Sequence, residues 1–251
     1  MSITPPSPSG SFARRFGALL LDAGWRVAFH VGPYALTAGV AAELAARLRA
    51  PFLWKLPVFA VVAGLLLIGV LLGAHVAAGR RAATAGRPPA PLRSHLAAAP
   101  RIMREAMVLL ALLTVIALAV IGTIDLALLL VEPTSGQDWP WTALRLVATG
   151  AGVGVSFILL AAGMALAASN TDRTGRLDDA VRRLHARSSP AFGVISLMIV
   201  TGTATTVLGF HLVHRFGIWP PMLADAVSKG LGFLVAITVV TIGSALLATD
   251  D

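Results

Sequence analysis

Six long apolar runs divide this chain, and they constrain its fold more than any other feature. Each run approaches or exceeds the roughly 20 residues that a helix needs to cross the hydrocarbon core of a bilayer. A segment in that core has no water to bond, so its backbone must satisfy its own hydrogen bonds, as an α-helix does. The predicted spans are residues 27–46, 56–78, 106–131, 142–168, 191–210 and 230–248.

A basic segment precedes every second apolar run. The clearest is Leu177–Arg187, which combines an apolar stripe with two Asp–Arg pairs spaced four residues apart. Its Leu-x4-Arg frame recurs in Leu21–Arg26 and Leu96–Arg101. The repeat predicts three units, each a basic amphipathic helix at the membrane surface followed by a hairpin of two spans.

These patterns predict an all-α integral membrane protein with six transmembrane helices in three hairpins. Charged residues make up only 13% of the chain, about half the share typical of soluble domains. Residues 1–11 are rich in Pro and Ser, lack the pattern of a signal peptide, and are expected to be a disordered tail. Residues 12–251 are expected to form a single domain. Its first amphipathic helix is predicted at residues 12–26, with Phe12, Phe16, Leu19 and Ala23 on one face.

The distribution of basic residues predicts the orientation. Fourteen of the 20 Lys and Arg residues lie before the first span, between spans two and three, or between spans four and five. The positive-inside rule then predicts a multi-pass protein of the cell membrane with both termini in the cytoplasm. The turn with Arg47, Arg49 and Lys55 is unusually basic for an outer loop, so either span one is re-entrant or these side chains snorkel to head groups. The Arg-rich, Lys-poor composition favours a bacterial source.

Several classes of function are excluded or disfavoured. The chain has no cysteine, which rules out disulfides and thiolate chemistry. The net charge of +8 arises from arginines between apolar runs, which is typical of contact with anionic head groups and not of nucleic-acid binding. Gly150-Ala-Gly-Val-Gly154 has no preceding strand, so it favours close helix packing over dinucleotide binding. Gly69 and Gly73 have the same packing spacing.

Ionisable residues near the apolar runs are the candidates for chemistry, because a charge in the bilayer is costly. Asp125, His211 and His214 could converge as a proton relay or acid–base group, and this is one hypothesis. The alternative is that the histidines lie among head groups and that Asp125 bonds a polar group on span five. Two histidines and a carboxylate are too few for a zinc site, so no metal or cofactor is predicted. The candidates also include three further residues: Glu43, His75 and Asp225.

Other polar residues favour structural roles. Glu43 and Arg47 are spaced four residues apart, which indicates an ion pair within a helix. The threonines of span five, residues 201–206, are expected to bond back to their own helix more often than to line a path. Arginines at the cytoplasmic side are predicted to meet anionic lipids or a partner such as an ATPase: Arg101, Arg104, Arg182, Arg183 and Arg187.

Two segments resemble a known family. Phe12-Ala-Arg-Arg-Phe16, leading to Gly24-Trp-Arg26, and Gly175–Leu184 resemble the integral-membrane domain named after glycerophosphoryl diester phosphodiesterases, together with its stand-alone six-span relatives. The resemblance implies an α-helical membrane domain. It does not imply phosphodiesterase activity, which in that family belongs to a separate soluble barrel domain.

The sequence therefore favours a non-catalytic membrane subunit or scaffold of a transport or export system. The alternative is a membrane-embedded enzyme acting on a lipid or polyprenyl substrate, with Asp125, His211 and His214 as its acid–base groups. No nucleophile elbow, P-loop or His-Glu-x-x-His motif is present to support a specific reaction.

Overall fold

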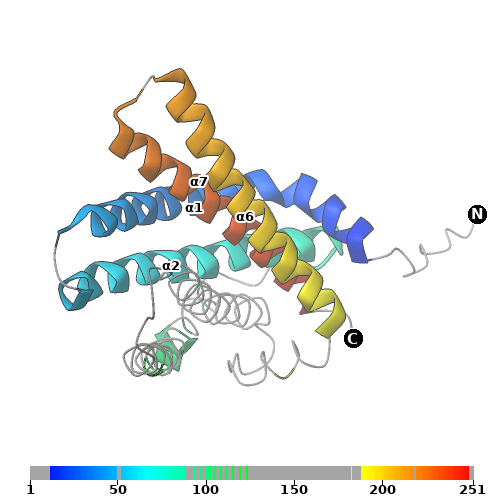
Figure 1. Cartoon of the computed structure of the whole chain (residues 1–251). Helices are drawn as coiled ribbons and strands as arrows, with labels where there is room; N and C mark the ends of the chain where they lie inside the picture. The colour runs from blue at the N-terminus through cyan, green and yellow to red at the C-terminus, as the bar shows by residue number, and fades with distance from the viewer. Residues whose placement is uncertain are drawn as a thin grey trace, which may run out of the picture.

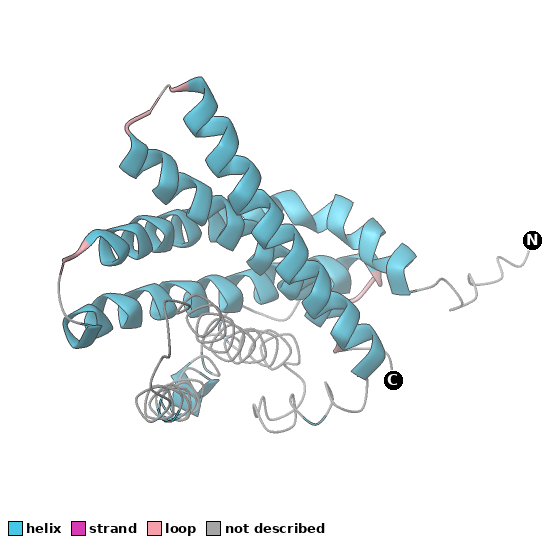
Figure 2. Ribbon diagram, viewed as in Figure 1, coloured by secondary structure: helices cyan, strands magenta, loops and turns pink. Residues whose placement is uncertain are grey.

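The computed structural model describes residues 12–49, 52–88, 188–217 and 219–248, with single positions between 93 and 123 and at 182. Everything that these ranges contain is helix, turn or loop, with no strand (Figure 2). The predicted tail and most of predicted spans three and four lie outside the described residues. The four helices are α1 (Phe12–Arg47), α2 (Phe52–Thr84), α6 (Ser188–Phe216) and α7 (Pro221–Leu247).

Helix α7 occupies the centre of the described bundle. It packs against α1 on one side and α6 on another, and it also contacts α2, which packs against α1 (Figure 1). Helices α1 and α7 run antiparallel: Gly24 lies near Ile242, whereas Gly39 lies near Gly230. The ends of α1 and α7 therefore meet, and charged residues near those ends can pair between the helices.

Helix α1 is one continuous helix of 36 residues, which corrects one part of the sequence prediction. A separate surface helix at residues 12–26, followed by a first span, was expected. The predicted apolar face does exist, but Phe16, Leu19 and Ala23 pack into the protein core instead of onto a membrane surface. The physical reason is that the sequence around Arg26 and Val27 contains no proline to end the helix, and the spacing of buried residues continues unchanged beyond them.

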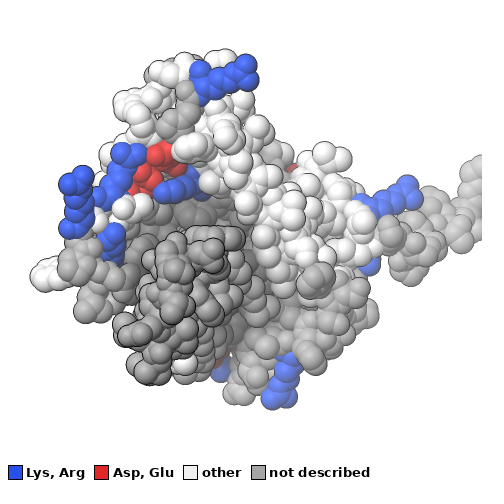
Figure 3. Space-filling view, in the orientation of Figure 1, with Lys and Arg blue, Asp and Glu red and all other residues white. Residues whose placement is uncertain are grey.

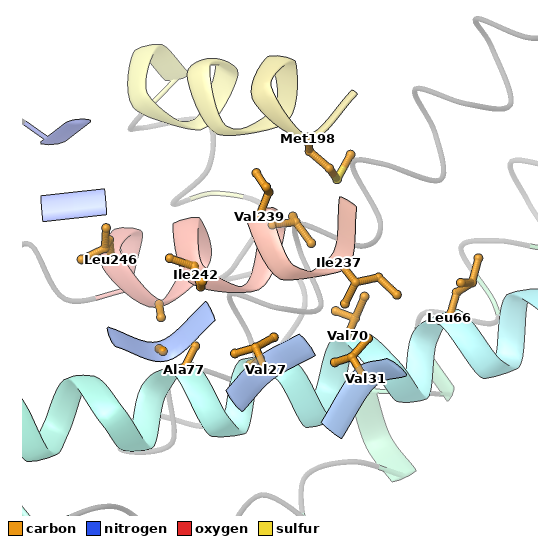
Figure 4. Close-up of a cluster of buried hydrophobic side chains, with 14 of the residues drawn as sticks. Val27, Val31, Leu66, Val70, Ala77, Met198, Ile237, Val239, Ile242 and Leu246 are labelled. Carbon is orange, nitrogen blue, oxygen red and sulfur yellow. The ribbon is translucent and has the colours of Figure 1, made fainter. Parts of the chain in front are cut away.

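The core forms where the four helices meet. Val27 and Val31 of α1 are fully buried, as is Leu67 of α2. Figure 4 shows the central cluster, in which side chains from all four helices interdigitate. Its labelled members are Val27, Val31, Leu66, Val70, Ala77, Met198, Ile237, Val239, Ile242 and Leu246.

Three of the described helices are long and apolar enough to cross a membrane: Pro57–Thr84, Gly193–Val213 and Pro221–Leu247. They overlap predicted spans two, five and six. Helix α1 is less apolar, because it contains His30 and Pro33 in its central part and Glu43 near its C-terminal end, and it is not among the three.

Helix α7 begins at Pro221, nine residues before the predicted sixth span. Proline suits the first helical turn, where its missing N–H would have no partner within the helix. The early start brings Asp225 and Lys229 into the helix as neighbours on one face.

Glycines allow α7 to approach both α1 and α6 closely. A Cβ atom on Gly39 of α1 would lie 2.7 Å from the Cα of Gly230 on α7, too close for any side chain. Two residues further along α7, a Cβ on Gly232 would lie 2.9 Å from the carbonyl oxygen of Gly202 on α6. Backbone contact of this kind is how small residues hold membrane helices together.

Candidate functional site

Glu43 is the most deeply buried charged residue of the described chain. Its residue surface is only 3% exposed, near the C-terminal end of α1. The carboxylate accepts a hydrogen bond from Arg47, one helical turn further on. It also accepts one from Lys229 of α7, with Nζ 2.5 Å from Oε2. Two cations thus compensate a carboxylate that has left water, as a buried charge requires.

Asp225 extends this arrangement into a network of four charges. The Nη2 atom of Arg47 lies 2.9 Å from Oδ2 of Asp225. The order is Asp225, Arg47, Glu43, Lys229, so the signs alternate and the net charge is zero. Figure 3 shows acidic side chains flanked by basic ones where α1 ends and α7 begins. We call these four residues the charge network.

The local sequence of each helix explains the network. In α1 and in α7 an acid precedes a base by four residues, which places both on one face. Because the helices run antiparallel, the acid of each one meets the base of the other. The close approach of Gly39 to Gly230 lies one turn from Glu43 and next to Lys229, and it brings the two faces within hydrogen-bonding range.

A second polar contact lies at the opposite end of α1. Arg80 of α2 donates to both carboxylate oxygens of Asp22, at 2.5 and 3.2 Å. Arg81 donates to the carbonyl oxygen of Ala245 in the last turn of α7, at 2.7 Å. The hydrogen bonds from Arg80 hold the pKa of the Asp22 carboxyl below its usual range, with Arg80 and Arg26 also acting through their charge.

The two polar ends are separated by about the thickness of a bilayer core. Asp22 and Glu43 are 21 residues apart in one helix, or about 32 Å at 1.5 Å per residue. The hydrocarbon core of a bilayer is about 30 Å thick. Between them, α1 contributes the buried apolar positions Val27, Val31 and Ala35 to the core.

The hypothesis that Asp125 and two histidines converge stays a prediction. Asp125 and the side chain of His214 lie outside what the structure describes. His211 is exposed near the end of α6, with its ring edge-on to Phe210 at 5.8 Å between centroids. The described residues contain no group of three or more His, Cys, Asp or Glu side chains that could hold a metal ion.

The predicted packing glycines are described only in α2. A Cβ on Gly69 would lie 3.3 Å from Ile237 and 3.4 Å from Val31, and one on Gly73 would lie 2.9 Å from Thr241. These glycines thus face α1 and α7 together. Gly150 and Gly154 lie outside the described residues.

The predicted contact arginines are only partly described. Arg101 pairs with Glu105 at 3.0 Å, on the same helical face. Arg104 and Arg182 are exposed. Arg183 and Arg187 lie outside the described residues, and His75 is half-buried in α2.

The threonines of α6 bond to their own helix. Thr201, Thr205 and Thr206 donate to carbonyl oxygens four residues earlier, at 2.6, 2.7 and 3.0 Å. This confirms the structural role that the sequence favoured for these three hydroxyl groups.

Lys229 is the functional candidate that sequence reasoning missed. The predicted sixth span begins at residue 230, so Lys229 lies outside it and the sequence prediction gives no contact with Glu43. The signal that could have found it is the repeated acid–base spacing of Glu43–Arg47 and Asp225–Lys229. Each pair lies within four residues of a glycine suited to close packing, Gly39 in α1 and Gly230 in α7.

Comparison of the chain with protein-family models, curated proteins and solved structures gives no match. The class of protein is therefore defined by its own features. It is all-helical over the described residues, and three of its helices are long and apolar enough to cross a membrane.

Proposed function

We propose that this chain is a multi-pass protein of the cell membrane that acts as a non-catalytic subunit or scaffold of a transport or export system. In this proposal its six spans form three hairpins with both termini in the cytoplasm. The resemblance to the integral-membrane domain of the glycerophosphoryl diester phosphodiesterase family is compatible with this role.

The observation that carries the proposal is that each residue of the charge network is paired with a residue of opposite charge. Glu43 is held by two cations, and Arg47 also pairs with Asp225. A carboxylate engaged in this way is a poor general base, because its partners favour the ionised form and occupy its oxygens. The same contacts lock α1 to α7, which suits a rigid membrane scaffold.

The two polar ends of α1 support its inclusion among the spans. A helix with ionic contacts about 32 Å apart and apolar side chains between them matches the profile of a bilayer. The neutral network also reduces the excess of positive charge in the outer turn, since Arg47 and Lys229 are matched by Glu43 and Asp225. The basic turn is then compatible with a fully spanning α1.

Reporter fusions test the six-span topology. Fusions after Arg87, after Arg187 and at the C-terminus should report the cytoplasm. Fusions after Arg49, Gln137 and Gly217 should report the outside. Two consecutive fusion sites on the same side would remove the intervening span from the proposal.

Site-specific crosslinking tests the scaffold role. A photo-crosslinking amino acid at Arg104 or Arg182 should capture a protein of a transport or export system in intact cells. The same probe at Arg49 is the matched control on the opposite side and should not capture that partner. Charge reversal at Arg182 and Arg183 should reduce capture from position 104. Capture of lipid alone from both cytoplasmic positions would contradict the proposal.

A further inference from the structure

The outer face of α1 is unusually apolar for a protein surface. Leu21, Trp25 and Phe29 are spaced four residues apart and are 85%, 61% and 75% exposed. The same face continues with Leu36 and Val40, each 39% exposed. It is opposite the face that packs into the core. Contiguous exposed side chains of this size mark an interaction surface and not a water-facing one.

A cation lies beside the aromatic part of this strip. The guanidinium carbon of Arg26 is 4.7 Å from the centroid of the Trp25 ring, a cation–π contact. His30 lies one turn further on, and its Nδ1 is 2.8 Å from the carbonyl oxygen of Arg26. Arg26 is exposed and forms no ion pair within the described residues. Its guanidinium N–H groups are therefore available to an anion that is not part of the described chain.

Charge at this end of the bundle favours an anionic partner. In the parts of α1 and α2 that lie at this end, the described acidic residue is Asp22, and Arg80 already binds it. The described basic residues of the same parts, with the turn that follows α2, are Arg14, Arg15, Arg26, Arg80, Arg81 and Arg87. Trp and Arg together are typical of the head-group level of a membrane.

We propose that Trp25 and Arg26 bind the head group of an anionic phospholipid, whose acyl chains lie along Phe29, Leu36 and Val40. The phosphate accepts hydrogen bonds from the Arg26 guanidinium, which the Trp25 ring holds in place. Between Phe29 and Leu36 the strip contains Gly32, where an added Cβ would meet nothing within 4 Å. An acyl chain can therefore lie flat against the helix at this point. The inference rests on the proposed spanning position of α1.

Trp25 itself can report the lipid beside it. A variant retaining only this tryptophan, with Trp54, Trp139, Trp141 and Trp219 changed to Phe, would be reconstituted in vesicles of mixed phosphatidylglycerol and phosphatidylcholine. One lipid at a time carries bromine on its acyl chains, at the same mole fraction. Brominated phosphatidylglycerol should quench Trp25 more strongly, corresponding to about fivefold enrichment of that lipid.

One control separates a site from ordinary annular lipid. Arg26→Gln in the Trp25-only protein should abolish the preference while leaving quenching by both lipids. Equal quenching of Trp25 by both lipids before that change would overturn the proposal but leave the spanning position of α1 intact. A preference that survives Arg26→Gln would overturn it as well.

A third outcome would also overturn the proposal. If neither brominated lipid quenches Trp25, this face is covered by protein or lies outside the bilayer, and the lipid site is wrong in either case. Should the quadruple substitution prevent folding, native mass spectrometry of the natural sequence provides the second measurement. The natural sequence should retain phosphatidylglycerol over phosphatidylcholine, and Arg26→Gln should lose that selectivity. Equal retention by both proteins would contradict the proposal.

Discussion

At the scale of single residues, the account depends on how Glu43 is compensated. The sequence predicted its pair with Arg47, because both lie in one helix and spacing alone determines that contact. It did not predict Lys229, because that contact depends on how α1 and α7 are oriented and how closely they pack. Contacts within a helix are local, whereas contacts between helices require the tertiary fold.

Removing the Glu43 carboxylate should destabilise the protein. We expect Glu43→Ala to lower the free energy of unfolding in detergent by about 3 kcal/mol, the low end for a broken buried pair because Lys229 stays 34% exposed. Replacing both Glu43 and Lys229 with Met should recover most of the loss. Thermal unfolding followed by circular dichroism measures both effects. Glu105→Ala, at the pair with Arg101, is the control and should cost under about 0.5 kcal/mol. Equal effects at the two glutamates would contradict the account.

The Asp22–Arg80 pair predicts a pH dependence. The folded-state pKa of Asp22 is depressed, so its contribution to stability is present above the unfolded pKa of about 4 and is lost as the pH falls through the folded value. Arg80→Gln should therefore lower the melting temperature at pH 7. The difference from the natural sequence should shrink below about pH 4. A difference that stays constant down to pH 2 would show that Arg80 acts by other means.

At the scale of elements, helix existence was more predictable than helix boundaries. Apolar length indicated α2, α6 and α7, because burial of a long apolar run in a bilayer leaves few alternatives to a helix. The sequence prediction missed that α1 is continuous and that α7 begins early. In both places polar residues lie within the helix, and apolar length alone does not indicate a helix there. Asp225 and Lys229 lie within α7, where Arg47 and Glu43 of α1 compensate their charges.

The crossing of α1 and α7 should tolerate no side chain at Gly39. An added Cβ would meet backbone atoms of Ala226 and Gly230, which cannot move aside as a flexible side chain can. We expect Gly39→Ala to cost about 1–3 kcal/mol and to loosen the charge network one turn away. Gly64→Ala in α2 is the matched control: nothing lies within 4 Å of its Cβ, and alanine favours a helix by about 1 kcal/mol. Thermal unfolding of both variants should give shifts of opposite sign. A stabilising Gly39→Ala would show that the helices do not cross there.

At the scale of the whole molecule, the central claim is that α1 carries its two polar ends to opposite faces of a membrane. The apolar runs predicted an all-helical protein with helices of membrane length, and α2, α6 and α7 confirm that part of the prediction. The six spans and three hairpins stay a prediction. The candidate site was less predictable. Asp125 and His211 were predicted because an ionisable side chain in a bilayer has a high free-energy cost, whereas the described network of charges lies around Glu43. The free-energy cost of a charge in the bilayer identifies which residues need partners, but only the fold determines which partners they have.

The absence of cysteine from the chain gives the most direct test of this claim, because an introduced thiol has no background. Arg49 follows α1 next to the charge network, and Arg14 lies exposed in the first turn of α1, beyond Asp22. A membrane-impermeant maleimide applied to intact cells should label Arg49→Cys. The same reagent should label Arg14→Cys only after the membrane is permeabilised. Labelling of both positions in intact cells, or of neither before permeabilisation, would place them on one side and contradict the account.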